Sequence, residues 1–206
     1  TFRLISESFE HSEQWEKAIE YYLHYVKINP NNDYGHAHIA RCYDELEQID
    51  DAIEFYKKAI DINPHNIYAV TQYADVLVKK KGDNDSAINV LDQGIKNNPT
   101  QPENTTNISW LFRLKGEIYY KKQDFKQALD GYNKAIELDK MIEGGAFIFL
   151  RLAIIHYNLD QYKESIKSFY KCFDLDGETY KGVYSYYYLA ESLKNEKLYE
   201  ESANYF

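Results

Sequence analysis

The sequence contains few of the residues that interrupt or cross-link a polypeptide. Its 206 residues include 4 prolines, 9 glycines and 2 cysteines, while 44% of the residues are hydrophobic. This composition excludes a disordered, low-complexity chain and predicts an ordered core. Cys42 and Cys172 occupy small, buried positions of the repeat described below, so we interpret them as packing residues rather than as a disulfide. Such cysteine usage favours a reducing compartment, and we expect a cytoplasmic or nuclear protein.

The chain also lacks a long apolar run and an excess of basic residues. No segment is apolar over the length that crosses a bilayer, and no basic and then apolar leader follows Thr1. Acidic residues outnumber basic residues by 33 to 24, which gives a formal net charge of −9. Nucleic-acid backbones and anionic membranes require a basic footprint, so we expect neither nucleic-acid binding nor membrane insertion. The expected partner is a protein or a peptide.

One phrase of seventeen residues recurs along the chain. "EKAIEYYLHYVKINPNN" (16–32) returns as "DDAIEFYKKAIDINPHN" (50–66), with Ala18 and Ala52 lying 34 residues apart. This spacing is the period of a two-helix repeat unit. Four further copies contain "DSAINVLDQGIKNNPTQ", "KQALDGYNKAIELDK", "KESIKSFYKCFDLDG" and "EESANYF". Longer spacings in these copies are assigned to loops: one extra residue in "KKKGDND", seven in "NNPTQPENTTNIS", and three each in "KMIEGGAF" and "GETYKGVYS".

Each copy has the residue pattern of a closely packed helical hairpin. Small residues open the second helices: Ala18, Ala52, Ala87, Ala128, Ser165 and Ser202. Small residues about twelve positions upstream mark the first helices: Ser6, Ala40, Ala74, Gly116, Ala153 and Ala190. Bulky residues follow four positions after each second-helix small residue: Tyr22, Tyr56, Leu91, Tyr132, Phe169 and Phe206. Small residues let two helices approach closely. Pro30, Pro64 and Pro99 are expected to end the first three second helices.

The pattern resembles the tetratricopeptide repeat, and the best copy is "GHAHIARCYDELEQIDDAIEFYKKAIDINP". Three positions depart from the family pattern: His36, where Trp is usual, and Lys115 and His156. The resemblance implies an all-α, right-handed superhelical solenoid of antiparallel helix pairs. We expect a single array over 1–206, with repeats at approximately 1–32, 33–66, 67–101, 108–142, 146–179 and 183–206. The first and last repeats are incomplete, so we expect the native protein to continue beyond both ends.

No residues assemble into a recognisable catalytic or metal-binding motif. His36 and His38 are two positions apart and do not make the i, i+4 pair of a helical zinc motif. Asp83 and its neighbours fit a polar turn better than a calcium loop, since no glutamate follows at the required spacing. We expect no enzyme activity, no metal and no cofactor. The sequons at Asn84, Asn104 and Asn107 matter only in a secreted protein and are discounted.

The resemblance further implies that first helices line a concave groove that commonly holds a peptide or a partner helix. Some relatives clamp a chaperone C-terminal tail with Lys-x-x-x-Asn and Lys-x-x-x-Arg pairs, and no first helix here carries such a pair. A chaperone tail is therefore not expected. An aromatic residue lies six positions before the small residue in five successive first helices: Tyr34, Tyr68, Trp110, Phe147 and Tyr184.

The aromatic stripe becomes richer toward the C-terminus, where arginines accompany it. Tyrosine, tryptophan and arginine dominate binding hot spots. We therefore predict a partner-binding set in the last three copies: Trp110, Arg113, Phe147, Arg151, Tyr184, Tyr187 and Tyr188. The alternative is that the stripe only packs neighbouring hairpins together.

Three functional hypotheses follow from the sequence. The first is a non-enzymatic scaffold that binds a peptide or a helical segment in its concave groove. The second is a structural subunit of a large assembly that uses its edges and convex face. The third is a repeat arm that regulates an enzyme domain elsewhere in the gene product.

Overall fold

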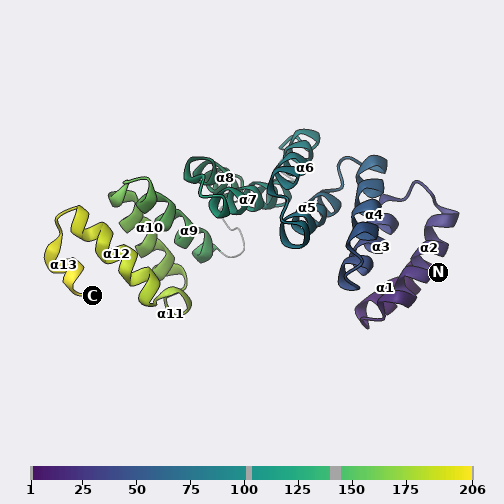
Figure 1. The fold of residues 1–206 in the computed structure, drawn as a ribbon, viewed down its shortest axis with the longest axis horizontal. Coiled ribbons are helices and arrows are strands. Elements are labelled where there is room, and N and C mark those ends of the chain that lie inside the picture. Colours follow the sequence, from purple (N-terminus) through teal and green to yellow (C-terminus); the bar gives the residue numbers. More distant parts are fainter. Residues whose placement is uncertain (1, 101–103, 140–144, 206) are drawn as a thin grey trace. The chain divides into compact units, whose positions relative to one another are not determined.

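The computed structural model describes residues 2–100, 104–139 and 145–205, and the regular elements of these residues are helices without any strand (Figure 1). The chain divides into two compact units, Thr1–Pro102 and Glu103–Phe206. Each unit is built from consecutive helical hairpins, so the all-α, repeat-based fold expected from the periodicity is confirmed.

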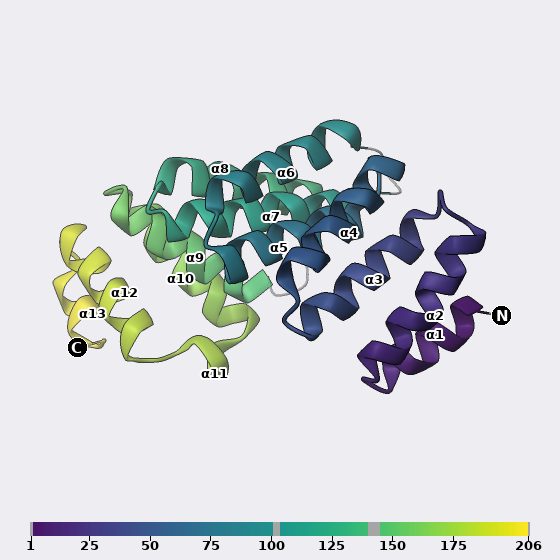
Figure 2. The same ribbon diagram turned by 45° about the vertical axis from the view of Figure 1, so that its right-hand side comes forward.

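The first unit contains three hairpins, and each helix packs against the next one along the chain (Figure 2). Its elements are α1 (Phe2–His11), α2 (Trp15–Ile28), α3 (Asp33–Glu45), α4 (Ile49–Ile62), α5 (Ile67–Val76), the π-helix η1 (Leu77–Lys81) and α6 (Asn84–Asn97). Asn32 and Asn66 cap α3 and α5, because their side-chain oxygens accept hydrogen bonds from the backbone amides of Gly35 and Ala69 at 2.8 and 2.9 Å. The hairpin boundaries therefore follow from local sequence chemistry.

The second unit repeats this arrangement. Its elements are α7 (Thr105–Lys121), α8 (Phe125–Leu138), α9 (Gly145–Asn158), α10 (Tyr162–Leu175), α11 (Gly177–Tyr180), α12 (Val183–Asn195) and α13 (Tyr199–Ala203). The short helix α11 lies in the segment "GETYKGVYS", which was predicted as loop. It begins beside Asp176, whose carboxylate accepts a hydrogen bond from the backbone amide of Thr179. The loop insertions predicted in "NNPTQPENTTNIS" and "KMIEGGAF" fall partly at 101–103 and 140–144, outside the described residues.

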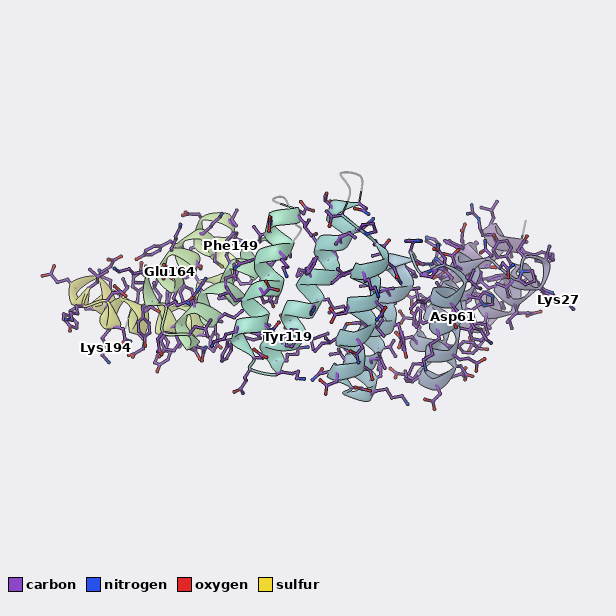
Figure 3. The ribbon with its side chains drawn as sticks, turned by 90° about the horizontal axis from the view of Figure 1, so that it is seen from above. Lys27, Asp61, Tyr119, Phe149, Glu164 and Lys194 are labelled. Carbon is purple, nitrogen blue, oxygen red and sulfur yellow. The ribbon has the colours of Figure 1, made fainter. Side chains whose placement is uncertain are left out.

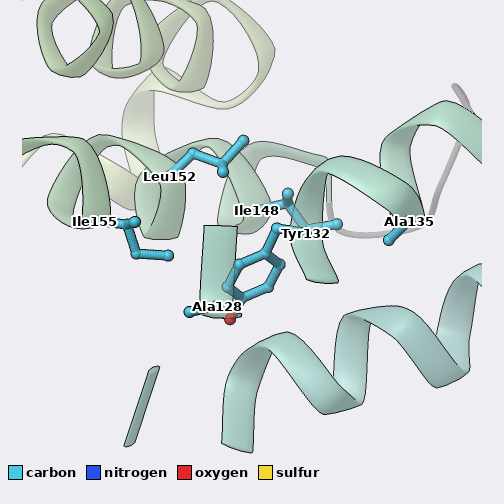
Figure 4. Close-up of a cluster of buried hydrophobic side chains, with 6 residues drawn as sticks. All are labelled: Ala128, Tyr132, Ala135, Ile148, Leu152 and Ile155. Carbon is cyan, nitrogen blue, oxygen red and sulfur yellow. The ribbon is translucent and has the colours of Figure 1, made fainter. Parts of the chain in front are cut away.

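The small residues predicted at the helix contacts are buried in every hairpin. Helices α7 and α8 approach closely, since a Cβ atom added to Gly131 would be 2.9 Å from the Cα of Gly116. The bulky residues Tyr22, Tyr56, Leu91, Tyr132 and Phe169 are fully buried, while Phe206 lies outside the described residues. Figure 4 shows Tyr132 among aliphatic side chains of α8 and α9. Polar residues such as Lys27 and Asp61 are exposed on the second helices (Figure 3).

Helix ends follow the predicted prolines. Helices α2, α4 and α6 each end two residues before a proline: Pro30, Pro64 and Pro99. The cysteines are also as predicted, since Cys42 and Cys172 are buried and free. Burial raises the pKa of the Cys172 thiol to about 11, which keeps it unreactive at neutral pH.

The turns inside the hairpins share one backbone conformation. Five of them place a residue other than glycine in the left-handed region, with φ between 55° and 64°: Glu13, Glu47, Gln123, Asp160 and Lys197. The third hairpin differs. Its extra residue is absorbed by the wide turns of η1, and Gly82 then ends the helix at a φ of 67°.

Candidate functional site

The predicted partner-binding residues of the second unit form three groups on α7, α9 and α12. Trp110 and Arg113 make the first group on α7, where both side chains are half-buried. The guanidinium carbon of Arg113 lies 3.9 Å from the centroid of the Trp110 ring. A guanidinium this close to an indole face makes a favourable cation–π contact, which holds both side chains in place.

Arg151 is the centre of the second group. Its guanidinium carbon lies 4.6 Å from the Phe147 ring centroid and 4.5 Å from that of Tyr120 on α7. The same guanidinium donates to both carboxylate oxygens of Glu117, from Nε at 3.1 Å and from Nη2 at 3.0 Å. Glu117 also accepts a hydrogen bond of 2.6 Å from the hydroxyl of Tyr132. Arg151 is thus already paired within the chain, which the sequence did not indicate.

The third group consists of three tyrosines on α12. Tyr184 and Tyr187 are 54% and 49% exposed, and Tyr188 lies between them with ring centroids at 4.8 and 5.4 Å. Tyr188 also makes an edge contact with Tyr157 of α9 at 4.9 Å. These rings therefore present a contiguous aromatic surface in which two members face solvent.

An open pocket connects the second and third groups. It has a volume of about 340 Å³ and is lined by Tyr120 and Phe125, by Ile154 of α9, and by Tyr184 and Tyr188 of α12. Polar side chains including Gln123 and Asn158 complete its wall. Tyr120 stands in both the pocket wall and the Arg151 contact, so it joins the two groups. Trp110 and Arg113 are not part of this wall.

Sequence reasoning missed a charged cluster in the first unit. Glu10 of α1 is 5% exposed and accepts a hydrogen bond of 2.6 Å from the Tyr22 hydroxyl. Nδ1 of His38 lies 2.9 and 3.0 Å from its two oxygens, and Nη1 of Arg41 lies 3.1 Å away. Burial alone would raise the pKa of Glu10, but these hydrogen bonds and charges outweigh it and lower the pKa below 4.5.

The His38 ring is enclosed by tyrosines. Its centroid lies 4.1 Å from that of Tyr34, 5.6 Å from Tyr22 and 5.4 Å from Tyr68. Burial raises the pKa of Tyr68 to about 12. The aromatic residues Tyr34 and Tyr68 that the sequence placed on the groove face thus surround an ionic cluster. The sequence feature that could have predicted this cluster is an acidic residue on the first helix, Glu10, in the same hairpin as the buried second-helix tyrosine Tyr22.

Within the described ranges, no group of three or more His, Cys, Asp or Glu side chains is arranged to hold a metal ion. No helix in the described part of the chain is both long and apolar enough to cross a membrane. His36, considered above as a metal ligand, stacks on Phe55 with centroids 5.8 Å apart.

Comparison with known proteins identifies the repeat type. Sequence profiles of the tetratricopeptide repeat match residues 45–104, 114–140 and 148–179, which together exceed half of the chain. A comparison with curated protein sequences finds no match.

Solved structures with the same fold span most of the chain. PilF of Pseudomonas aeruginosa is 18% identical, with a TM-score of 0.75 over 99% of this chain and 86% of that protein. YrrB, described as a tetratricopeptide repeat protein with an unusual peptide-binding site, is 15% identical, with a TM-score of 0.72 over 89% and 88%. PilW, a type IV pilus biogenesis factor, is 15% identical, with a TM-score of 0.69 over 99% and 88%. At these identities the likeness concerns the fold. The matching profiles, together with the stacked hairpins and their buried small residues, show that the chain belongs to the tetratricopeptide repeat family.

Proposed function

We propose that the chain is a non-enzymatic scaffold that binds an extended or helical segment of another protein along the first-helix face of its second unit. The observation that carries this proposal is the exposure of Tyr184 and Tyr187 beside an open, aromatic-walled pocket. Large tyrosines are costly to leave in water and supply contact area at a small entropic cost when a partner covers them. We also propose a cytoplasmic or nuclear location.

The proposed contact set keeps all seven residues predicted from the sequence: Trp110, Arg113, Phe147, Arg151, Tyr184, Tyr187 and Tyr188. Their roles differ. The exposed tyrosines and the pocket are the anchors. Arg151 positions the Phe147 and Tyr120 rings through its bond to Glu117, and an acidic partner side chain would have to compete with that carboxylate.

The second candidate function is a structural subunit that uses its edges and the outer faces of its second helices. Exposed apolar residues on those helices favour it: Leu23 and Ile28 on α2 and Leu175 on α10. Leu23, Ile28 and Leu175 are scattered singly, whereas the tyrosines of α12 are contiguous. The groove-binding proposal is therefore preferred.

Affinity capture from the source lysate, quantified by mass spectrometry, tests the proposal. The bait is the full chain, either unchanged, as Tyr184→Ala/Tyr187→Ala, or as Tyr199→Ala. Tyr199 is a matched control because it is 62% exposed on α13, away from the pocket wall. We expect the double variant to lose its specific partners and Tyr199→Ala to keep them. Retention by the double variant with loss by Tyr199→Ala would overturn the proposal in favour of an edge contact.

Calorimetry with the captured partner then gives the size of the effect. The double variant should weaken binding by at least about 2 kcal/mol, roughly thirtyfold, if these tyrosines are hot spots. Circular dichroism of each bait must show unchanged helicity. We expect this because both side chains are about half in solvent, so their truncation leaves little cavity.

A further inference from the structure

Three second helices carry a fully buried tyrosine at the same repeat position: Tyr22, Tyr56 and Tyr132. In two of these hairpins the hydroxyl donates to a carboxylate of the paired first helix. Tyr22 donates to Glu10 and Tyr132 donates to Glu117, both at 2.6 Å. A buried phenol needs such a partner, because an unsatisfied hydroxyl keeps its full desolvation cost.

Both carboxylates also receive an arginine from the next first helix. Arg41 of α3 reaches Glu10 at 3.1 Å, and Arg151 of α9 reaches Glu117 through two hydrogen bonds. The chain therefore uses one arrangement twice, with an acid, a buried tyrosine and a guanidinium. In each case the guanidinium comes from the neighbouring repeat.

The second hairpin contains the acid and the tyrosine without that arginine. One repeat of 34 residues separates each member of the Glu10 cluster from its counterpart in the second hairpin. Asp44 corresponds to Glu10 and Tyr56 to Tyr22, while Gln72 corresponds to His38 and Asp75 to Arg41. The hydroxyl of Tyr56 and Oδ1 of Asp44 are both buried, and neither has a hydrogen-bond partner among the described residues. Aspartate is one methylene shorter than glutamate. The positions of His38 and Arg41 are taken by an amide, Gln72, and a second acid, Asp75.

The nearby lysines are engaged elsewhere. Nζ of Lys80 lies 2.6 Å from Glu47, and Nζ of Lys79 lies 2.6 Å from Asp75. Burial raises the pKa of Asp44, and Lys80 only partly opposes this shift. Burial also raises the pKa of Tyr56, with Asp44 among the charges that add to the effect. Glu45, Glu47 and Asp75 raise the pKa of Asp44 further, so a cation placed beside Asp44 and Tyr56 would relieve an excess of negative charge.

We propose that Asp44 and Tyr56 form a subsite for an arginine side chain of a partner protein. The guanidinium would donate to the carboxylate of Asp44 and to the hydroxyl oxygen of Tyr56, as Arg41 and Arg151 complete the corresponding clusters from within the chain. Asp44 is half-buried, so part of its side chain faces solvent, while its Oδ1 and the Tyr56 hydroxyl are buried and would be uncovered by the entering guanidinium. This inference rests on the proposed scaffold function and adds the chemistry of one partner residue.

Nα-acetyl-arginine amide is the probe, titrated into the full chain while amide resonances are followed by nuclear magnetic resonance. Nα-acetyl-citrulline amide is the neutral control of the same shape, and Nα-acetyl-lysine amide tests the ammonium alternative. We expect the arginine probe to shift resonances around Asp44 and Tyr56, the citrulline probe to shift none of them, and Asp44→Asn to weaken the response at least about tenfold. Equal responses of the wild type and Asp44→Asn would overturn the proposal, and a stronger response to lysine would overturn its guanidinium part.

A variant that supplies the arginine within the chain gives a second readout. Gln72 occupies the repeat position of Arg151, two residues before the small residue of its helix. Gln72→Arg should raise the melting temperature and block the arginine probe, while Gln72→Met, of similar length but uncharged, should do neither. If Gln72→Arg melted at the same temperature as the wild type and still bound the arginine probe, the proposed subsite would be wrong.

The probe reports on the first unit, whereas the capture experiment reports on Tyr184 and Tyr187 of the second unit. A protein that captures partners through its tyrosines but ignores the arginine probe would therefore refute only this inference. A protein that binds the probe at Asp44 but captures no partner would instead refute the proposed function.

Discussion

Glu117 and Asp44 are both first-helix acids near the buried tyrosine of their hairpin, but their surroundings are opposite. Glu117 receives three hydrogen bonds, one from the Tyr132 hydroxyl and two from the Arg151 guanidinium. Asp44 has a buried oxygen without a hydrogen-bond partner in the described part of the chain, beside the equally unpartnered Tyr56 hydroxyl. One cluster stabilises the fold, while the other costs stability that a ligand could recover. First-helix acids near the buried tyrosine of their hairpin can therefore serve different purposes.

The largest expected effect comes from breaking the completed cluster. Glu117→Ala removes the acceptor of both Tyr132 and Arg151 and leaves a half-buried guanidinium without its carboxylate. We expect a loss of about 3 kcal/mol, at the lower end for a buried pair because both side chains retain some exposure. Hydrogen exchange of α7–α10 measures it locally. Glu164→Ala, at an exposed position of α10, is the control and should change stability by less than about 0.5 kcal/mol.

Glu10→Gln should have the next largest effect, about 2 kcal/mol at pH 7, since it weakens charge-assisted bonds from His38 and Arg41. The folded state lowers the pKa of Glu10 below 4.5, so its stabilisation is present above that pH and is lost as pH falls through the lower folded value. Denaturation of wild type and variant at pH 7 and at about pH 3 tests the sign. A stability difference between wild type and Glu10→Gln that was larger at about pH 3 than at pH 7 would contradict a lowered pKa of Glu10.

Asp44→Asn should act in the opposite direction. An amide removes the buried charge and can donate toward Tyr56, so we expect about 1 kcal/mol of stabilisation at pH 7. The folded state raises the pKa of Asp44 above 3.8, so the cost of its ionised form is absent below 3.8 and grows as pH rises through the folded value. The advantage of the variant should therefore vanish in acid. Chemical denaturation over the same pH range as for Glu10→Gln decides this, and destabilisation at pH 7 would show that Asp44 is already satisfied.

The smallest effect separates the two tyrosines. Tyr132→Phe deletes a 2.6 Å hydrogen bond to Glu117 and should cost about 1 kcal/mol. Tyr56→Phe deletes a hydroxyl without a hydrogen-bond partner in the described chain, so stability should change by less than about 0.5 kcal/mol or increase. Thermal melts of both variants give the comparison directly. Equal losses would mean that Tyr56 has an ordered water as its partner.

The hairpins could be predicted because their signal is local and periodic. Ala52 and Tyr56 recur at fixed spacings, and Pro64 marks the helix end, so each element is specified by residues within one repeat. The carboxylate clusters depend on side chains from neighbouring repeats and on their reach. Arg151 was assigned to a partner because it accompanies the aromatic stripe, whereas its acceptor within the chain lies 34 residues upstream.

The first-helix positions of the candidate surface could be predicted, because helical spacing is also local and periodic. Tyr184, six residues before Ala190, follows from helical geometry, and its exposure agrees with a position on the open face. The pocket wall could not be derived, because Tyr120, Ile154 and Tyr188 come from three helices whose approach depends on packing. Glu10 was overlooked because a lone acid in a helix is usually solvent-exposed.

The wide turn of η1 bears on how such genes change length. Ala74 and Ala87 are separated by one residue more than Ala40 and Ala52, yet both pairs are buried at their helix contact. The π-helical turns at Leu77–Lys81 take up the added residue before the next helix begins. A single-codon insertion at this point therefore leaves the inter-helix contact in register.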